Sequence, residues 1–140
     1  MTVCVLDASV TLTWLLDDEI DPISDGLMDR VATEGAVAPA IWPTEVANGL
    51  LSATRCGRIP ADRAKGMLET LVAFDVRIEP TPLARLHTRI FALATGARLT
   101  VYDACYLDLA LTQSLPLATL DQQLRQAAEA LNVPVLPARP

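Results

Sequence analysis

Residues 100–110 read Thr-Val-Tyr-Asp-Ala-Cys-Tyr-Leu-Asp-Leu-Ala. After Asp103, apolar residues follow at i+3, i+4, i+7 and i+8, which is the spacing of one buried stripe along a helix. These positions hold Tyr106, Leu107, Ala110 and Leu111. The pattern therefore predicts a helix packed against a core, with the Asp103 carboxylate in its first turn, where the helix dipole favours negative charge.

Short apolar runs alternate with helical patterns on both sides of this helix. Strands are predicted at residues 3–6, 36–40, 76–79, 117–120 and 133–136, and further helices at 8–16, 23–34, 43–57, 60–72, 82–96 and 122–131. Strands that alternate with helices are typical of an α/β fold with a mostly parallel sheet. The length of 140 residues suits one domain with its own core, so residues 1–140 are expected to form a single domain.

The composition excludes several classes of protein. No apolar run approaches the roughly 20 residues that cross a bilayer, and the first residues do not read as a signal peptide. The three cysteines, Cys4, Cys56 and Cys105, lack C-x-x-C spacing, and His87 is the single histidine, so neither a disulfide framework nor a zinc site is expected. Gly-x-Gly-x-x-Gly and Walker motifs are absent, which argues against a nucleotide cofactor. We therefore expect a cytoplasmic protein whose cysteines are small buried residues.

The net charge of −6 is concentrated in one segment. Residues 17–34 contain seven acidic side chains and one basic side chain, Arg30, whereas acids and bases balance over the rest of the chain. An acidic total predicts weak non-specific binding to nucleic acid, but it does not exclude a polyanionic substrate. Basic residues that could contact phosphates surround the turn at 57–60. They are Arg55, Arg58, Arg63 and Lys65.

Four carboxylates stand near the starts of predicted helices. Asp7, Glu45 and Asp121 come after predicted strands, and Asp103 opens the helix quoted above. Ligands of α/β sheets bind beyond the carboxyl ends of the strands, so the four side chains are expected to face one end of the sheet. Carboxylates gathered without a neighbouring base repel one another, and a hard divalent cation such as Mg²⁺ or Mn²⁺ removes that conflict.

The same carboxylates have a structural interpretation. Acidic residues are favoured in the first turn of a helix whatever its function. Thr100-x-x-Asp103 resembles a capping box, and Thr119-x-x-Gln122 is one, with Asp121 at its N2 position. From the residue pattern alone, a metal site and a set of helix caps both remain open.

Four motifs resemble those of the PIN-domain ribonuclease family, and of VapC-type toxins in particular. They are Val-Leu-Asp-Ala-Ser at 5–9, Pro-Thr-Glu-Val-Ala-Asn at 43–48, Thr-x-Tyr-Asp-Ala-x-Tyr-Leu at 100–107 and Ala-Thr-Leu-Asp-Gln-Gln-Leu at 118–124. They occur in the family's order and cover nearly the whole chain. The resemblance implies an α/β/α sandwich with a five-stranded sheet of order 3-2-1-4-5, and Mg²⁺- or Mn²⁺-dependent endonucleolytic cleavage of RNA.

The resemblance also implies roles for individual residues and partners. The family's acidic quartet corresponds to Asp7, Glu45, Asp103 and Asp121, and its small hydroxyl residues near the metal-bound waters correspond to Ser9 and Thr119. Asp7 and Asp103 would bind the ion directly, and the other two directly or through water. The implied partners are a transfer or ribosomal RNA loop as substrate, a cognate antitoxin of a type II toxin–antitoxin pair, and a second copy in a homodimer. The acidic 17–34 segment departs from the family's pattern.

Other interpretations remain to be tested. A phosphatase of the aspartyl-phosphate type would carry a second Asp two residues after Asp7, where this chain has Ser9. A receiver domain would carry an acidic pair beside the first strand, and Asp17 and Asp18 come a full helix too late. The non-enzymatic alternative is a catalytically silent PIN-like interaction module whose acidic residues only cap helices. Chelator-sensitive cleavage of RNA separates the nuclease from this module.

Overall fold

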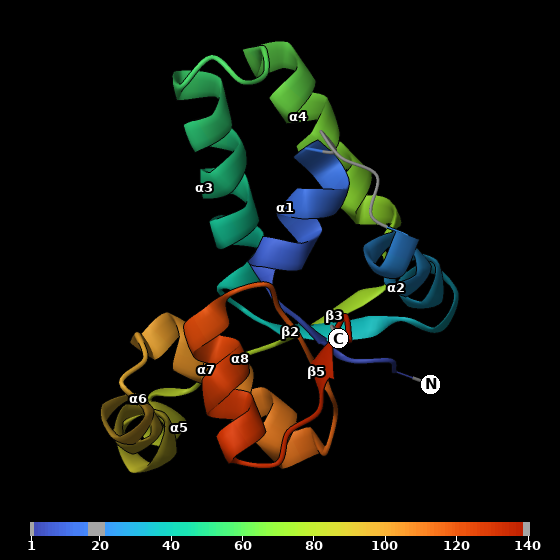
Figure 1. Ribbon diagram of the computed structural model, residues 1–140. Coiled ribbons are helices and arrows are strands. Elements are labelled where there is room, and N and C mark those ends of the chain that lie inside the picture. The colour runs from blue at the N-terminus through green and yellow to red at the C-terminus, as the bar shows by residue number, and fades with distance from the viewer. Residues whose placement is uncertain (1, 17–21, 139–140) are drawn as a thin grey trace.

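A parallel five-stranded sheet forms the centre of the molecule, which is described by a computed structural model covering residues 2–16 and 22–138 (Figure 1). The strand order is β3-β2-β1-β4-β5, and every neighbouring pair is parallel. The strands are β1 (Val5–Leu6), β2 (Ala36–Pro39), β3 (Val76–Glu79), β4 (Leu117–Ala118) and β5 (Val135–Leu136). The predicted α/β class and strand order are confirmed, and the sheet is parallel throughout rather than mostly parallel.

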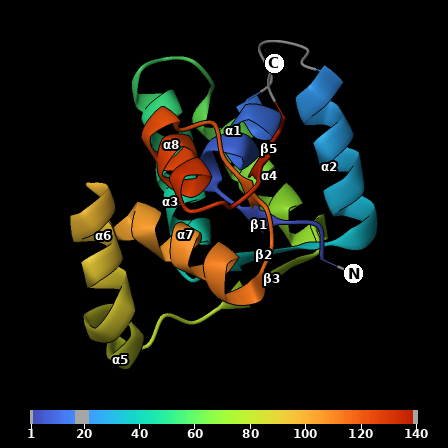
Figure 2. The same ribbon diagram turned by 60° about the horizontal axis from the view of Figure 1, so that its bottom comes forward.

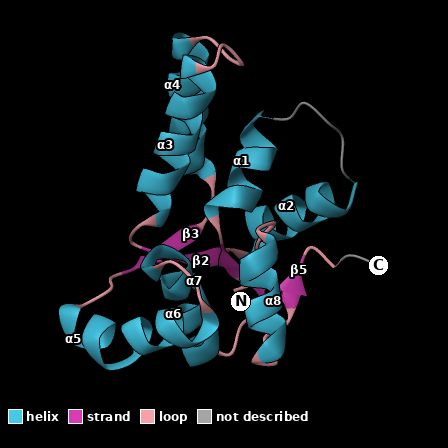
Figure 3. Ribbon diagram, turned by 60° about the vertical axis from the view of Figure 1, so that its left-hand side comes forward, coloured by secondary structure: helices cyan, strands magenta, loops and turns pink. Residues whose placement is uncertain are grey.

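Helices cover both faces of the sheet, so the predicted α/β/α sandwich is confirmed (Figures 1 and 3). On one side lie α1 (Ala8–Leu16), α3 (Trp42–Arg55) and α4 (Ala61–Thr70), with α2 (Pro22–Glu34) packed beside α1. On the other side lie α5 (Leu83–Arg85), α6 (Phe91–Ala97), α7 (Val101–Gln113) and α8 (Gln122–Ala130). Within the described residues, no helix is long and apolar enough to cross a membrane.

Apart from β3, the strands are shorter than the apolar runs that predicted them, and the chain turns into a helix directly after β1 and soon after β4. Ladder hydrogen bonds nevertheless continue past the strand ends. The Asp7 amide donates to the Ala118 carbonyl at 2.9 Å, and the Thr119 amide donates to the Leu136 carbonyl at 2.9 Å. The backbones that carry Asp7 and Thr119 are therefore held side by side at the carboxyl ends of β1 and β4.

Helix α7 is the most deeply buried helix of the described chain. All seven residues from 104 to 110 are buried, so the predicted single apolar stripe is too narrow. The helix packs on β1 and β2 with one side and contacts α6 and α8 with others, which leaves little of its surface for solvent. Figure 2 shows α7 between the sheet and α6. Tyr102 and Asp103 lie in its first turn, where the side chains become accessible at the surface.

The predicted helix over 82–96 is interrupted by a π-helical turn, η2 (Leu86–Ile90), between α5 and α6. An extra residue in a turn shifts the side chains that follow onto a different face. Phe91, the residue directly after this turn, is accordingly 66% exposed, and Leu83, ahead of the turn in α5, is 76% exposed. On the inner side, the Arg85 and Arg89 Nε atoms lie 2.5 and 3.1 Å from the buried Asp108 carboxylate.

The cysteines differ from the expectation in one respect. Cys4 and Cys105 are buried as predicted, but Cys56 is exposed, because it follows the last turn of α3 at the tip of the α3–α4 hairpin. All three are free thiols. Four of the seven acidic residues of the 17–34 segment lie outside the described residues; they are Asp17, Asp18, Glu19 and Asp21.

Candidate active site

Asp7 is buried at the end of β1, and its side chain is 5% exposed. The Ser9 and Thr119 hydroxyls both donate to its Oδ2 atom at 2.7 Å. Burial raises the pKa of the Asp7 carboxyl most strongly, the two hydroxyl bonds lower it, and the charge of Asp121 raises it further. The two bonds on Oδ2 fix the plane of the carboxylate, so its position is set before any ligand arrives.

Ser9 and Thr119 also join the two chain segments that meet at the sheet's switch in strand order. Their hydroxyl oxygens lie 3.3 Å apart. The Leu120 amide donates to the Ser9 hydroxyl at 3.0 Å, and the Asp121 amide donates to the Thr119 hydroxyl at 3.1 Å. The two residues that were expected near metal-bound waters thus contact Asp7 itself and order the turn that carries Asp121.

Glu45 lies in the first turn of α3 and is held from across the sheet. The Tyr106 hydroxyl donates to Glu45 Oε1 at 2.6 Å, and the Tyr106 side chain is fully buried on α7. Burial raises the pKa of Glu45, the Tyr106 hydroxyl lowers it, and the Asp7 charge raises it. Sequence reasoning placed Tyr106 in the core only. Its position three residues after Asp103, on the same face of one helix, is the signal that would have assigned it to the site.

Asp103 opens α7 as the sequence predicts. Thr100 is the N-cap, and its hydroxyl accepts the Asp103 amide at 3.1 Å. Burial raises the pKa of Asp103 to about 6, and the charges of Asp7, Asp121 and Glu45 add to the effect. The charges that act on the Asp103 carboxyl are all carboxylates, so the four acidic side chains lie within electrostatic reach of one another.

Asp121 is the most exposed of the four and has a structural role of its own. It is the N-cap of α8, and its Oδ1 atom accepts the Leu124 amide at 2.9 Å. The predicted capping box with Thr119 as N-cap and Asp121 at N2 is therefore wrong, because Asp121 itself caps the helix while the Thr119 hydroxyl accepts the Asp121 amide and donates to Asp7. The helix begins two residues later than that motif implied.

The donor set suits a hydrated divalent cation better than a closed cage. Across residues 2–16 and 22–138, no group of three or more His, Cys, Asp or Glu side chains is close enough to hold a metal ion by itself. Mg²⁺ keeps several waters and needs only one or two direct carboxylates. Hard carboxylate oxygens under mutual repulsion are the ligands that Mg²⁺ and Mn²⁺ take, so the residues present fit such an ion.

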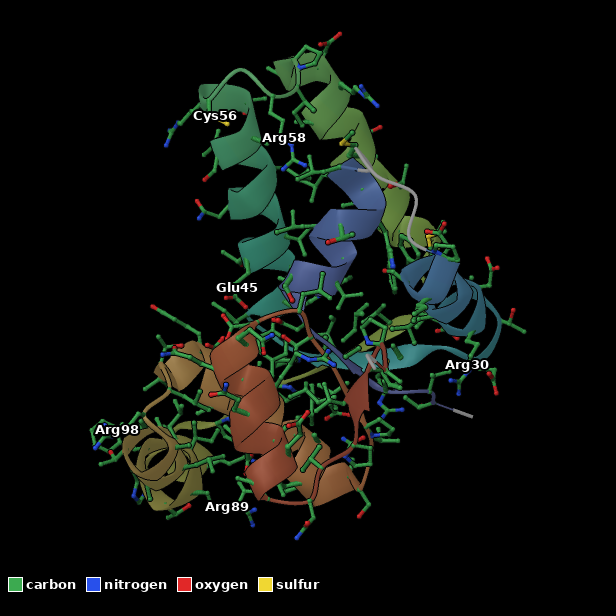
Figure 4. All side chains as sticks on the ribbon, viewed as in Figure 1. Arg30, Glu45, Cys56, Arg58, Arg89 and Arg98 are labelled. Carbon is green, nitrogen blue, oxygen red and sulfur yellow. The ribbon has the colours of Figure 1, made fainter. Side chains whose placement is uncertain are left out.

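The predicted phosphate contacts lie away from these carboxylates. Figure 4 shows Arg58 and Cys56 at one end of α3 and Glu45 at the other. Arg55 is ten residues beyond Glu45 on the same helix, which places it about 15 Å away along the axis. Arg63 and Lys65 lie beyond the hairpin on α4, and both are exposed. The structure therefore groups Arg55, Arg58, Arg63 and Lys65 near the hairpin tip and not beside the acidic cluster.

Comparisons with known proteins agree on the fold. The family model described as the PIN domain matches residues 4–130. Ribonuclease VapC3 of Pyrobaculum aerophilum is 40% identical over 90 residues, which cover 64% of this chain and 69% of the relative. Among solved structures, PAE2754 from Pyrobaculum aerophilum gives a TM-score of 0.70 at 23% identity, covering 90% of this chain and 84% of that one. FitAcB from Neisseria gonorrhoeae gives 0.64 at 20% identity, covering 94% of each chain.

Proposed function

The chain belongs to the PIN-domain family and is related to a VapC ribonuclease, and on that basis we propose that it is a Mg²⁺- or Mn²⁺-dependent endoribonuclease. The observation that carries the proposal is the convergence of Asp7, Glu45, Asp103 and Asp121. The pKa values of Asp7, Glu45 and Asp103 are each raised in part by the charge of at least one of the other three carboxylates. Such repulsion in a partly buried site is relieved by a divalent cation.

In this proposal the four carboxylates have different roles in ion binding and in activation of the attacking water. Asp7 and Asp103 would hold the ion directly, and Glu45 and Asp121 would do so directly or through water. The bound ion would supply charge neutralisation at the scissile phosphate and a water of lowered pKa. Glu45 or Asp121 would orient the attacking water or take its proton for in-line attack on phosphorus. The bond between phosphorus and the 3′ oxygen breaks, and that oxygen takes up a proton from solvent. The products carry 5′-phosphate and 3′-hydroxyl ends.

The hydrogen bonds of the site support preorganisation for this chemistry. Ser9 and Thr119 hold Asp7, Tyr106 holds Glu45, and the Thr100 cap holds the first turn of α7 that carries Asp103. Side chains fixed in this way need little rearrangement when the substrate arrives, which is what electrostatic catalysis requires. Members of the PIN-domain family generally use divalent metals, which is consistent with this assignment.

We further propose that the protein is the toxin of a type II toxin–antitoxin pair, with a cognate antitoxin as inhibitor, a transfer or ribosomal RNA loop as substrate and a homodimer as the working form. The relationship to Ribonuclease VapC3 supports this assignment. One observation favours the alternative of a catalytically silent module, because Asp121 does cap α8 through Oδ1.

Incubation of the purified protein with total cellular RNA separates the two functions. We expect cleavage in Mg²⁺ or Mn²⁺, none with excess chelator, and 5′-phosphate ends at the mapped cut sites. Asp103→Asn keeps the side chain's shape but removes its charge, so it should abolish cleavage while the protein stays folded. Asp62→Asn, in the exposed first turn of α4, is the matched control and should cut like the parent. Full activity of Asp103→Asn would reject the proposed function.

A further inference from the structure

A pocket of about 380 Å³ opens directly beside the candidate active site, between the start of α3 and the start of α7. Its walls are Ile41, Thr44, Glu45, Asn48, Gly49 and Tyr102. Glu45 belongs both to this pocket and to the acidic cluster, and Figure 4 places it at the base of α3, next to α7. A group bound in the pocket is therefore adjacent to whatever reacts at the carboxylates. The volume is at the small end of the range for ligand pockets, enough for one ring system and its sugar.

Tyr102 gives the pocket an accessible aromatic face. Its side chain is 58% exposed, and it is the residue directly before Asp103. The backbone beneath it is fixed, because Thr100 caps α7 and residues 104–110 are buried. Trp42 and Tyr106 are buried, and Trp14 stacks on Phe74 with 5.9 Å between ring centroids, so these aromatic rings already have partners. The Tyr102 ring is therefore open to solvent and is carried by a fixed stretch of backbone.

The polar groups of the pocket are neutral apart from Glu45. Thr44 and Asn48 are exposed and stand four residues apart on α3, so their hydroxyl and amide groups share one face of the helix. The lining residues include no lysine or arginine. The pocket walls thus offer a phosphate no positively charged side chain, whereas an aromatic face with an amide and a hydroxyl suits a flat, neutral, hydrogen-bonding ligand. A nucleobase has that chemistry.

We propose that this pocket is a nucleobase subsite, in which a base flanking the scissile phosphate stacks on Tyr102 and is hydrogen-bonded by Asn48 and Thr44. The inference rests on the proposed function and defines its substrate more narrowly. A base can enter the pocket only when it is unstacked from its neighbours, so the site selects single-stranded or looped RNA over a duplex. Asn48, whose amide offers both donors and an acceptor, sets the preference among the four bases.

The test uses a short synthetic RNA centred on the strongest cut site mapped in total RNA, and a set of copies that each lack one base. With the parent protein, one abasic position beside the cut should lower kcat/KM by about 5- to 100-fold, the range expected for one base stacked on an aromatic ring. Tyr102→Ala should show a decrease of the same size on the intact RNA and no further decrease on that abasic RNA. Tyr102→Phe keeps the ring and should stay close to the parent, and Asn48→Ala should change the base preference at that position.

Two controls separate the removal of a subsite from damage to the protein. Phe91→Ala removes another exposed aromatic ring, on α6, and should leave kcat/KM unchanged. Calorimetric titration with Mn²⁺ should give the same affinity for Tyr102→Ala and the parent, because the ring does not hold the ion. The subsite is overturned if Tyr102→Ala and the parent have equal kcat/KM on the intact RNA, or if removing the base lowers kcat/KM equally in both. Either result would favour the pocket as a binding site for a side chain of a protein partner. A parent protein that cuts no RNA at all overturns the proposed function and the subsite with it.

Discussion

At the scale of single residues, Asp103 carries a negative charge that burial, and then the neighbouring carboxylates, make unfavourable. Its pKa is raised to about 6 in the folded protein, above the ordinary value of 3.8, so the folded state binds a proton more readily than the unfolded chain. The metal-free protein should therefore gain stability as the pH falls from 7 through 6 and lose it again as the pH rises. The penalty is fully present above the folded pKa.

Asp103→Asn removes this penalty, and we expect it to raise the free energy of unfolding of the metal-free protein at pH 7 by about 1–2 kcal/mol, after allowance for partial solvent exposure. The advantage over the parent should shrink at pH 5. Thermal melting in chelator at both pH values measures it, with Asp62→Asn as the exposed control. Identical melting temperatures for Asp103→Asn and the parent at both pH values would show that the Asp103 charge does not destabilise the folded protein.

Tyr106 acts through Glu45, so its removal should be visible in metal binding as well as in cleavage. Tyr106→Phe deletes the hydroxyl that donates to Glu45 Oε1 at 2.6 Å and keeps the buried ring. Removal of such a supporting bond lowers metal affinity or activity by about 10- to 100-fold in metal sites, and Mn²⁺ titration should show a decrease of that size. Tyr102→Phe removes an exposed hydroxyl instead and should leave Mn²⁺ affinity unchanged. An unaltered Mn²⁺ affinity in Tyr106→Phe would contradict the positioning role.

At the scale of secondary-structure elements, Asp108 ties α7 to the α5–η2 segment. Its carboxylate is 2% exposed and accepts from Arg85, the last residue of α5, and from Arg89 within the π-helical turn. Asp108→Asn keeps the shape but weakens two charge-assisted bonds, and we expect a decrease of about 1–3 kcal/mol in the free energy of unfolding by urea titration. Glu79→Gln in the exposed Arg77–Glu79 pair is the matched control and should cost under about 1 kcal/mol. Equal decreases for the two variants would mean that burial adds nothing to the Asp108 pair.

The same elements show what the sequence can and cannot predict. Alternating strand and helix patterns predicted every strand position and the bounds of α1 and β3, because apolar periodicity reports directly on which side of an element is buried. The π-helical turn was not predictable from the apolar pattern. The turn holds one residue more than an α-helical turn and so moves Phe91 to the surface, and no residue type in the sequence marks this change. Local motifs were ambiguous in the same way, for the Thr119 hydroxyl bonds to Asp7, which is 112 positions away, instead of capping α8.

Within the candidate site, the sequence could predict the positions of those residues that lie at a strand or helix end. Asp7, Glu45, Asp103 and Asp121 each lie at such an end, so topology alone brings them together. Tyr106 and Tyr102 were not assigned to the site from the sequence. The apolar pattern indicates only a core position for Tyr106, and nothing in the pattern connects Tyr102 with a site until the position of α3 is known. Contacts across the sheet depend on tertiary packing that no local window contains.

At the scale of the whole molecule, Glu45 lies at the base of α3 and Arg58 at the opposite end of the helix (Figure 4). Arg55, Arg63 and Lys65 also belong to the α3–α4 hairpin, at the end of α3 away from the carboxylates. An RNA bound at the carboxylates reaches these cations only if it extends along α3 for about 15 Å. The net charge of −6 opposes non-specific binding, so phosphate binding at the tip would supply much of the salt-dependent affinity.

Removing two of these cations therefore tests the path of the RNA. Arg63 and Lys65 are exposed, and Arg63→Gln with Lys65→Gln should flatten the plot of log K against log salt concentration by about 0.7 for each phosphate of a single strand that is no longer neutralised. Cleavage of a short RNA that covers only the cut site should stay unchanged, because the carboxylates are untouched. Arg30→Gln, on α2 and paired with Glu34, removes a positive charge elsewhere and should keep the parent's slope. An unchanged slope in the double variant would place the RNA away from the hairpin and leave the carboxylate end of α3 as its main binding surface.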